Sequence, residues 1–164
     1  MADVTDTYYA GDAFHGYGSQ FMVGDGASPE GFNAVADILT ITPGAMETAR
    51  IDKTHLRSPA AHKESLAGLR DSGPFTITGN WRPGHESQNN AGGGSGSFAS
   101  GGLLSMWIDR VTRNFKIVCS DTDTTAFPFS GYVSKFQPGE IGTDDKVNFM
   151  AEIQPAADFS LALP

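Results

Sequence analysis

Apolar and polar residues alternate along much of the chain, which is the pattern of strands that bury one face. Phe75, Ile77 and Trp81 fall on one side of such a strand, while threonines fall on the other. The same period of two runs through 104–108, 115–119 and 147–153, and we expect further strands at about 19–24, 34–42 and 126–136. The sequence therefore predicts a mainly β fold, a sandwich or barrel with long loops and one short flanking helix.

The helix is expected just before the strand at 75–81. Ser58 can cap it, and Pro59 suits its first turn, where a missing N–H has no cost. Leu66 and Leu69 then lie on one face at spacing i, i+3. Gly73-Pro74 would end the helix before the strand begins.

Two long segments without an apolar period are predicted to be loops that are mobile in an isolated subunit. Residues 43–58 begin near Pro43-Gly44 and carry much of the basic charge. Residues 83–102 include Asn89-Asn-Ala-Gly-Gly-Gly-Ser-Gly-Ser97, which is similar to a flexible linker. Loops of this length within a compact domain tend to be functional or disordered.

Composition and charge exclude several classes of protein. The 164 residues include 20 Gly and 9 Pro, and only 18% are charged, which argues against a helical bundle. The net charge of −8 argues against a protein that grips nucleic acid phosphates. No apolar run approaches the ~20 residues of a membrane helix. Since the N-terminal sequence also lacks the features of a signal peptide, we expect a cytoplasmic protein until something larger is built from it.

The charge is unevenly distributed along the chain. Residues 1–49 hold seven acids and no Lys or Arg, whereas five bases outnumber two acids within 50–70. Such asymmetry usually marks solvated faces, but it also suits copies that meet head to tail.

No motif for catalysis, metal or cofactor binding emerges. The lone Cys119 cannot form an internal disulfide and alternates with Phe115 and Ile117, so it is interpreted as a small buried residue rather than a nucleophile. No two of the four histidines have the i, i+4 spacing of a zinc helix; they are His15, His55, His62 and His85. We therefore expect no enzyme, no metal and no cofactor.

Several other segments that could indicate a binding site are better explained by structural roles. Gly92-Gly-Gly-Ser-Gly-Ser97 lacks the lysine and the following helix of a phosphate loop, and Gly24-Asp25-Gly26 reads as a tight turn. Asp121-Thr-Asp123 and Asp144-Asp145 lack calcium-loop spacing, so turn or strand-cap roles are favoured over cation binding. The aromatic residues in the expected strands are interpreted as core or interface anchors; they are Trp81, Trp107 and Tyr132.

A set of short segments follows in a characteristic order over residues 18–154. They are Gly18-Ser-Gln-Phe-Met-Val-Gly-Asp-Gly26 and the residues up to Asp37, Pro43-Gly44, Ile51-Asp-Lys-Thr-His-Leu-Arg-Ser58, Leu69-Arg-Asp-Ser-Gly73, Phe75-Thr-Ile-Thr-Gly-Asn-Trp-Arg-Pro83, Phe129-Ser-Gly-Tyr-Val-Ser-Lys-Phe136 and Asp144-Asp145. In this order the chain resembles the tail tube protein, or major tail protein, of long-tailed bacteriophages with non-contractile tails.

The resemblance implies a non-enzymatic virion protein that forms hexameric rings, which stack into the tail tube. One sheet of each copy would line the bore, and double-stranded genome DNA would pass through it during ejection. The implied partners are further copies, the tail tip and tail terminator proteins and a tape-measure protein in the lumen, with no membrane. The protein would be located in the virion, after assembly in the host cytoplasm.

The resemblance also divides the chain into three parts. Residues 18–154 would form the tail-tube β-domain, 1–17 an N-terminal arm and 155–164 a C-terminal tail. The arm contains aromatic residues that can dock on a neighbour, namely Tyr8, Tyr9, Phe14 and Tyr17. The end at Pro164 leaves no room for the immunoglobulin-like domain that some relatives carry.

Two groups of residues are candidates for contacts in such a tube. The family's loop that reaches a neighbouring ring corresponds to about 43–58, where the candidate contact residues are Arg50, Asp52, Lys53 and Arg57. Each phosphate that a protein neutralises adds about −0.9 to the salt slope of DNA binding, so a bore for sliding DNA favours acids over bases. The candidate lumen-facing acids are Asp25, Glu30, Asp37, Asp121 and Asp123.

Two alternative functions stay open. One is a monomeric β-sandwich binding module, which would expose Trp81 or Trp107 in a groove. The other is the tube protein of a contractile tail or secretion apparatus, which would share ring assembly.

Overall fold

The computed structural model describes residues 16–58, 62–121 and 124–156. Within these ranges the chain is mostly strands, with one short α-helix and one 3-10 helix, so the predicted mainly β fold with a single helix is confirmed. In chain order the elements are β1 (Gln20–Gly24), β2 (Phe32–Ala34), β3 (Ile38–Thr42), β4 (Met46–Asp52), β5 (Ser65–Ser72), β6 (Phe75–Asn80), η2 (Gly96–Phe98), α1 (Leu103–Asp109), β7 (Thr112–Val118), β8 (Ala126–Pro138) and β9 (Asn148–Pro155).

Seven of the strands form one antiparallel sheet in the order β2-β1-β7-β8-β9-β6-β3. The long strand β8 pairs with β7 through its first half and with β9 through its second, and the register shifts between Val133 and Lys135. The extra residue bends β8, as bulges do, so the two halves of the sheet curl towards each other. The last strand in the order, β3, therefore lies near β1.

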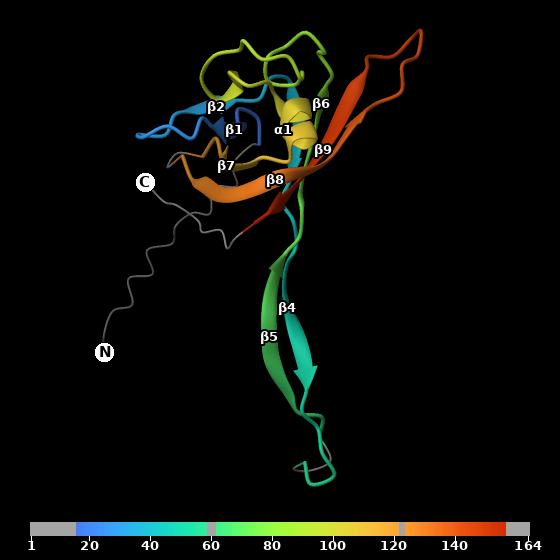
Figure 1. Cartoon of the computed structure of the whole chain (residues 1–164). Helices are drawn as coiled ribbons and strands as arrows, with labels where there is room; N and C mark the ends of the chain where they lie inside the picture. Colours follow the sequence, from blue (N-terminus) through green and yellow to red (C-terminus); the bar gives the residue numbers. More distant parts are fainter. Residues whose placement is uncertain (1–15, 59–61, 122–123, 157–164) are drawn as a thin grey trace, which may run out of the picture.

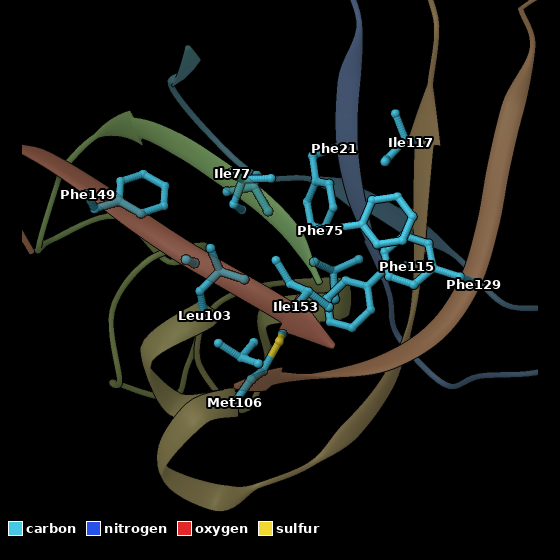
Figure 2. Close-up of a cluster of buried hydrophobic side chains, with 14 of the residues drawn as sticks. Phe21, Phe75, Ile77, Leu103, Met106, Phe115, Ile117, Phe129, Phe149 and Ile153 are labelled. Atoms are coloured by element: carbon cyan, nitrogen blue, oxygen red, sulfur yellow. The ribbon is translucent and has the colours of Figure 1, made fainter. Parts of the chain in front are cut away.

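The core fills the space inside the curled sheet. Four phenylalanines gather at its centre, and the ring centroids of Phe75 and Phe129, from the two halves of the sheet, lie 4.3 Å apart (Figure 2). Leu103 and Met106 of α1 close the core on another side. Most of the other buried apolar side chains come from alternate positions of the strands, as the period of two predicts: Val23, Ile77, Ile117, Val133, Phe149, Ala151 and Ile153. Val35 and Phe98 are buried outside the strands.

Strands β4 and β5 form a separate two-stranded ribbon that projects from the curled sheet (Figure 1). It continues the β3–β6 pair without a change of register, since Thr42 pairs with Thr76 and Met46 with Ser72. The connection is Pro43-Gly44 on one strand and Gly73-Pro74 on the other, and we call it the neck. Two prolines without an N–H interrupt the hydrogen-bond ladder there, which separates ribbon from body.

The strands expected at 19–24, 34–42, 75–81, 115–119, 126–136 and 147–153 are confirmed as β1, β3, β6, β7, β8 and β9. The strand expected at 104–108 is wrong, because this segment is α1. Its residues are apolar at nearly every position, so they fit a period of two as well as the i, i+3 spacing that places Leu103 and Met106 in the core.

The helix expected from Ser58 to Leu69 is also wrong, since Ser65–Ser72 is strand β5. Arg50 pairs with Ala67 and Thr48 with Arg70, so β5 carries one extra residue as a bulge. A bulge shifts the alternation of a strand by one, which produces the i, i+3 spacing of Leu66 and Leu69 that a helix also shows. The loop expected at 43–58 is likewise corrected, because it contains β4.

The Gly- and Ser-rich segment at 83–102 is packed on the body, so the prediction of a flexible linker is wrong. Ser87, Gln88, Ser97 and Phe98 are buried. The Ser97 hydroxyl donates to the carbonyl of Val23 over 2.5 Å, which ties the segment to β1. Small residues allow this close packing as well as they allow flexibility, and composition does not separate the two.

Candidate assembly surfaces

The ribbon exposes both of its faces to solvent. All seven residues of β4 are exposed, and no other layer covers the ribbon in the part of the chain that the structure describes. On one face Ile51 pairs with Leu66, and each is 53% exposed. On the same face, nearer the neck, the acids Glu47 and Asp71 lie directly opposite each other. Such a like-charge pair destabilises an isolated ribbon.

The four candidate contact residues all lie on this ribbon or at its tip, so the structure brings them together. Arg50 and Asp52 are two apart on β4 and therefore share a face. Hydrogen bonds from Thr54 and the nearby charge of Arg50 lower the pKa of Asp52, so this carboxylate stays ionised. Lys53 and Arg57 are exposed beyond the end of β4.

The described part of the tip, residues 53–58 and 62–64, is organised around Glu64. The Glu64 carbonyl accepts from the Lys53 N–H over 3.1 Å, and its carboxylate lies 3.9 Å from His55 Nε2. The lysine and arginine side chains of the tip form no ion pair within the described residues. Leu56 is fully exposed, with a relative accessibility of 107%. The tip thus presents an exposed aliphatic side chain in a segment that also exposes Lys53, Arg57 and Lys63.

Two of the candidate lumen acids, Asp25 and Glu30, lie in the loop between β1 and β2. Asp25 Oδ1 accepts from the N–H groups of Ala27 and Gly31 at 2.9 and 3.0 Å, and these bonds lower its pKa. The Glu30 carboxylate accepts from the Asn114 side chain at 2.9 and 3.1 Å. The tight turn expected at Gly24-Asp25-Gly26 is wrong, because residues 25–31 form a longer loop between β1 and β2, and the Asp25 side chain closes this loop on Gly31.

The other candidate acids do not join this pair. Asp37 lies in the turn before β3, where its carboxylate is 3.1 Å from Arg82 Nη1. Asp121 follows β7 at the opposite end of the β1–β7 pair, and the N–H and hydroxyl of Thr125 donate to it and lower its pKa. This contact gives Asp121 the turn role favoured by the sequence. Asp123 lies outside the described residues.

The connection between β8 and β9, residues 139–147, is a second projection from the body (Figure 1). It carries three acids against one base, with the exposed Ile141 among them: Glu140, Asp144, Asp145 and Lys146. Beside it is a groove lined mainly by Leu39, Thr78, Gln137 and Met150. The sequence identified only the acid pair of this connection. The groove could not be predicted, because the strands that line it are far apart in the chain.

A further groove lies between α1 and β8. Trp107, which is 46% exposed, lines it together with Tyr132, Ile108 and Arg110. Trp107 is therefore at a surface, although on a helix and not on the expected strand. Trp81 packs against the core.

The chemistry of the remaining side chains is sparse. Cys119 is half-buried just beyond β7, and burial raises the pKa of its thiol, which disfavours the reactive thiolate. Among the described residues no group of three His, Cys, Asp or Glu side chains is placed to hold a metal ion. Within the same residues no helix is long and apolar enough to cross a membrane.

Solved structures share this fold. A chain from the tail of an empty gene transfer agent particle with C6 symmetry has a TM-score of 0.66 at 12% identity, covering 92% of this chain and 99% of that one. A chain from the sheath/tube terminator of an extracellular contractile injection system has a TM-score of 0.62 at 10% identity, covering 91% and 96%. A chain from the tube-terminating cap of the anti-feeding prophage has a TM-score of 0.59 at 10% identity, covering 96% and 99%. Identities this low establish the fold alone.

Sequence comparison identifies the family. No curated protein matches the chain. The family described as "Lambda phage tail tube protein, TTP" matches residues 14–101, which is more than half of the 164 residues and spans the ribbon, its neck and the packed Gly/Ser-rich segment. The chain therefore belongs to the lambda phage tail tube protein family and is a structural protein of the virion tail.

Proposed function

We propose that copies of this chain close into hexameric rings, and that the rings stack into a tube through which the genome passes during ejection. The observation that carries the proposal is the β4–β5 ribbon, which extends from the body with both faces uncovered. At about 3.3 Å per residue, the seven residues of β4 alone span roughly 23 Å. This is far enough to reach a neighbouring copy.

The ribbon has too few internal contacts to be stable as an independent folding unit. Two-stranded hairpins are marginally stable in water, and this one also exposes large aliphatic side chains along its length. They are Met46, Ile51, Leu56, Leu66 and Leu69. Apolar patches that a monomer leaves uncovered mark interaction sites, so the ribbon is suited to be buried against another copy.

Stacking of rings needs a contact that repeats head to tail. A head-to-tail contact between identical copies generates an open filament, whereas a rotation that closes generates a ring. We assign the contact between rings to the ribbon and its tip, with Arg50, Lys53 and Arg57 as bases and Asp52 as the ionised acid. Their exposure and their position on the projection support this assignment.

We propose that the lumen wall takes its charge from acids and carries no cluster of bases. Asp25 and Glu30 at one end of the β1–β7 pair, and Asp121 near the other, would give a bore lined by these strands a negative rim at both ends. Asp123, which lies outside the described residues, remains a candidate from the sequence alone. Asp37 contributes less charge because Arg82 partly neutralises it. A cryo-EM map of tubes with a lumen lined by lysine and arginine would overturn this assignment.

The proposal also assigns roles to the three parts of the chain and names further partners. Residues 18–154 form the tube domain, the aromatic segment 1–17 acts as an arm that docks on a neighbouring copy, and 155–164 form a tail. The tube would end at tail tip and tail terminator proteins and hold a tape-measure protein in its lumen, with no membrane involved. The protein has no catalytic role in this scheme.

Negative-stain electron microscopy of the concentrated full-length protein tests the proposal. Tubes of uniform width with six-fold symmetric end views are the expected result. A protein that stays monomeric at millimolar concentration would contradict ring assembly and favour a binding module that uses the Trp107 groove. A tube that recruits a contractile sheath would instead place the protein in a contractile system.

A further inference from the structure

We propose that the basic tip of the ribbon of one copy docks on the acidic β8–β9 end of a copy in the next ring. We define the tip as the described residues 53–58 and 62–64, and the β8–β9 end as residues 139–147 with the adjoining groove. The inference rests on the proposed stacking of rings and names the surface that receives the ribbon.

The two surfaces lie at opposite ends of the same pair of strands. Strand β6 pairs with β9 from Phe75↔Ile153 to Asn80↔Asn148. The ribbon leaves the body beside Phe75, whereas the β8–β9 connection begins beside Asn148. The two projections point away from each other in Figure 1. A tip therefore cannot reach the β8–β9 end of its own copy, and a contact between them joins two copies head to tail.

The charges of the two surfaces are complementary. The tip holds Lys53, Arg57 and Lys63 against Glu64, a formal net charge of +2. Residues 139–147 hold the opposite balance, a net charge of −2, from Glu140, Asp144 and Asp145 against Lys146. Complementary charges orient an interface and exclude the wrong register, because like charges placed together cost several kcal/mol.

The apolar features of the two surfaces also correspond. Leu56 projects from the tip without any neighbour covering it. The groove beside residues 139–147 has Leu39 and Met150 in its lining, and Leu39 is about half exposed. Ile141, at 75% exposure, extends the apolar surface onto the connection itself. An aliphatic side chain entering a groove, with a rim of opposite charges, is the usual anatomy of a specific interface.

Charge exchange between the two surfaces tests the inference. In variant K53E/R57E both the tip and the receiving surface of each copy are acidic. In variant D144K/D145K both the tip and the receiving surface are basic. Each should fold and form rings, and the critical concentration for tube growth should rise about tenfold or more. An equimolar mixture of the two should elongate again, because each tip then meets a surface of opposite charge. The readouts are sedimentation and electron microscopy, with circular dichroism to confirm folding.

Charge-preserving variants K53R/R57K and D144E/D145E are the matched controls, and both should form tubes like the unmodified chain. Normal tubes from either reversed variant would overturn the inference while leaving stacking intact. So would a mixture that fails to elongate although both variants are folded rings. Absence of tubes from the unmodified chain would instead contradict the proposed function itself.

Discussion

Truncating the two aliphatic side chains that pair across the ribbon should weaken tube assembly far more than folding. Ile51 and Leu66 face each other on β4 and β5 and contact no part of the core. Their contribution to the isolated subunit is therefore limited to one cross-strand pair, which is worth about 0.2–1 kcal/mol. In variant I51A/L66A the free energy of unfolding of the subunit should fall by no more than this amount.

The effect on assembly can be estimated from exposure. Each side chain is 53% exposed, so about half of its apolar surface is available for burial by a neighbour. Full burial of such a side chain contributes about 1.5–3 kcal/mol, so the two half-burials together contribute roughly 2 kcal/mol per subunit. Since every ~1.4 kcal/mol is a factor of ten, the critical concentration for tube growth should rise about 30-fold.

Sedimentation of tubes over a concentration series measures this critical concentration, and denaturant unfolding under dissociating conditions measures the stability of the subunit. Variant I51V/L66M, which nearly conserves volume and polarity, is the control and should assemble within about threefold of the unmodified chain. An unchanged critical concentration in I51A/L66A would refute the burial of this face. A loss of subunit stability as large as the loss of assembly would refute the separation of ribbon and body.

Four other substitutions test particular contacts. Gly44→Ala places a Cβ 1.9 Å from the Gly73 carbonyl oxygen, so the neck must shift, and we expect a loss of about 1–3 kcal/mol in denaturant unfolding together with faster proteolysis of the ribbon. Gln88→Ala removes three hydrogen bonds from a buried side chain and leaves their backbone partners unsatisfied, which should cost about 3 kcal/mol by the same measurement. Asp25 has a folded pKa below its ordinary value of 3.8, so its stabilisation is complete above that value and is lost as the pH falls through the lower folded pKa. Asp25→Asn should therefore flatten the acid limb of a stability-against-pH curve below about pH 4, and Asp121→Asn should do the same because Thr125 holds its pKa down in the same way.

The strands of the body were predictable because each buries one face. Phe75 and Ile77 point into a core and Thr76 and Thr78 away from it, so a local period of two reports the tertiary environment directly. The ribbon offers no such signal. All seven residues of β4 are exposed within the subunit, so nothing selects an alternation of apolar and polar residues along it.

Only the charged residues of the candidate site could be predicted from the sequence; their arrangement in space could not. Charge is a property of the sequence, so the bases of 50–57 could be named without a structure. Their projection from the body depends on pairing with residues 65–72, which local pattern assigned to a helix. The surface proposed to receive them combines Leu39 with Met150, residues 111 positions apart in the chain. The pairing of β3 and β9 with the two sides of β6 brings these residues together.

The neck explains how one chain serves both folding and assembly. Strands β3 and β6 continue from the body into the ribbon without a change of register. The sheet of the body is stabilised by the side chains that it buries, whereas the ribbon buries no such layer within the described subunit. At the boundary, Gly44 approaches Gly73 too closely for any side chain, and the Gly73 N–H donates to the Ala45 carbonyl over 2.8 Å. The prolines on either side remove the ladder bonds that would otherwise make ribbon and body one rigid sheet. Substitutions in the buried core of the body should therefore change the stability of the subunit, whereas substitutions beyond the neck should change the affinity between copies, because the contacts that stabilise each part are made by different residues.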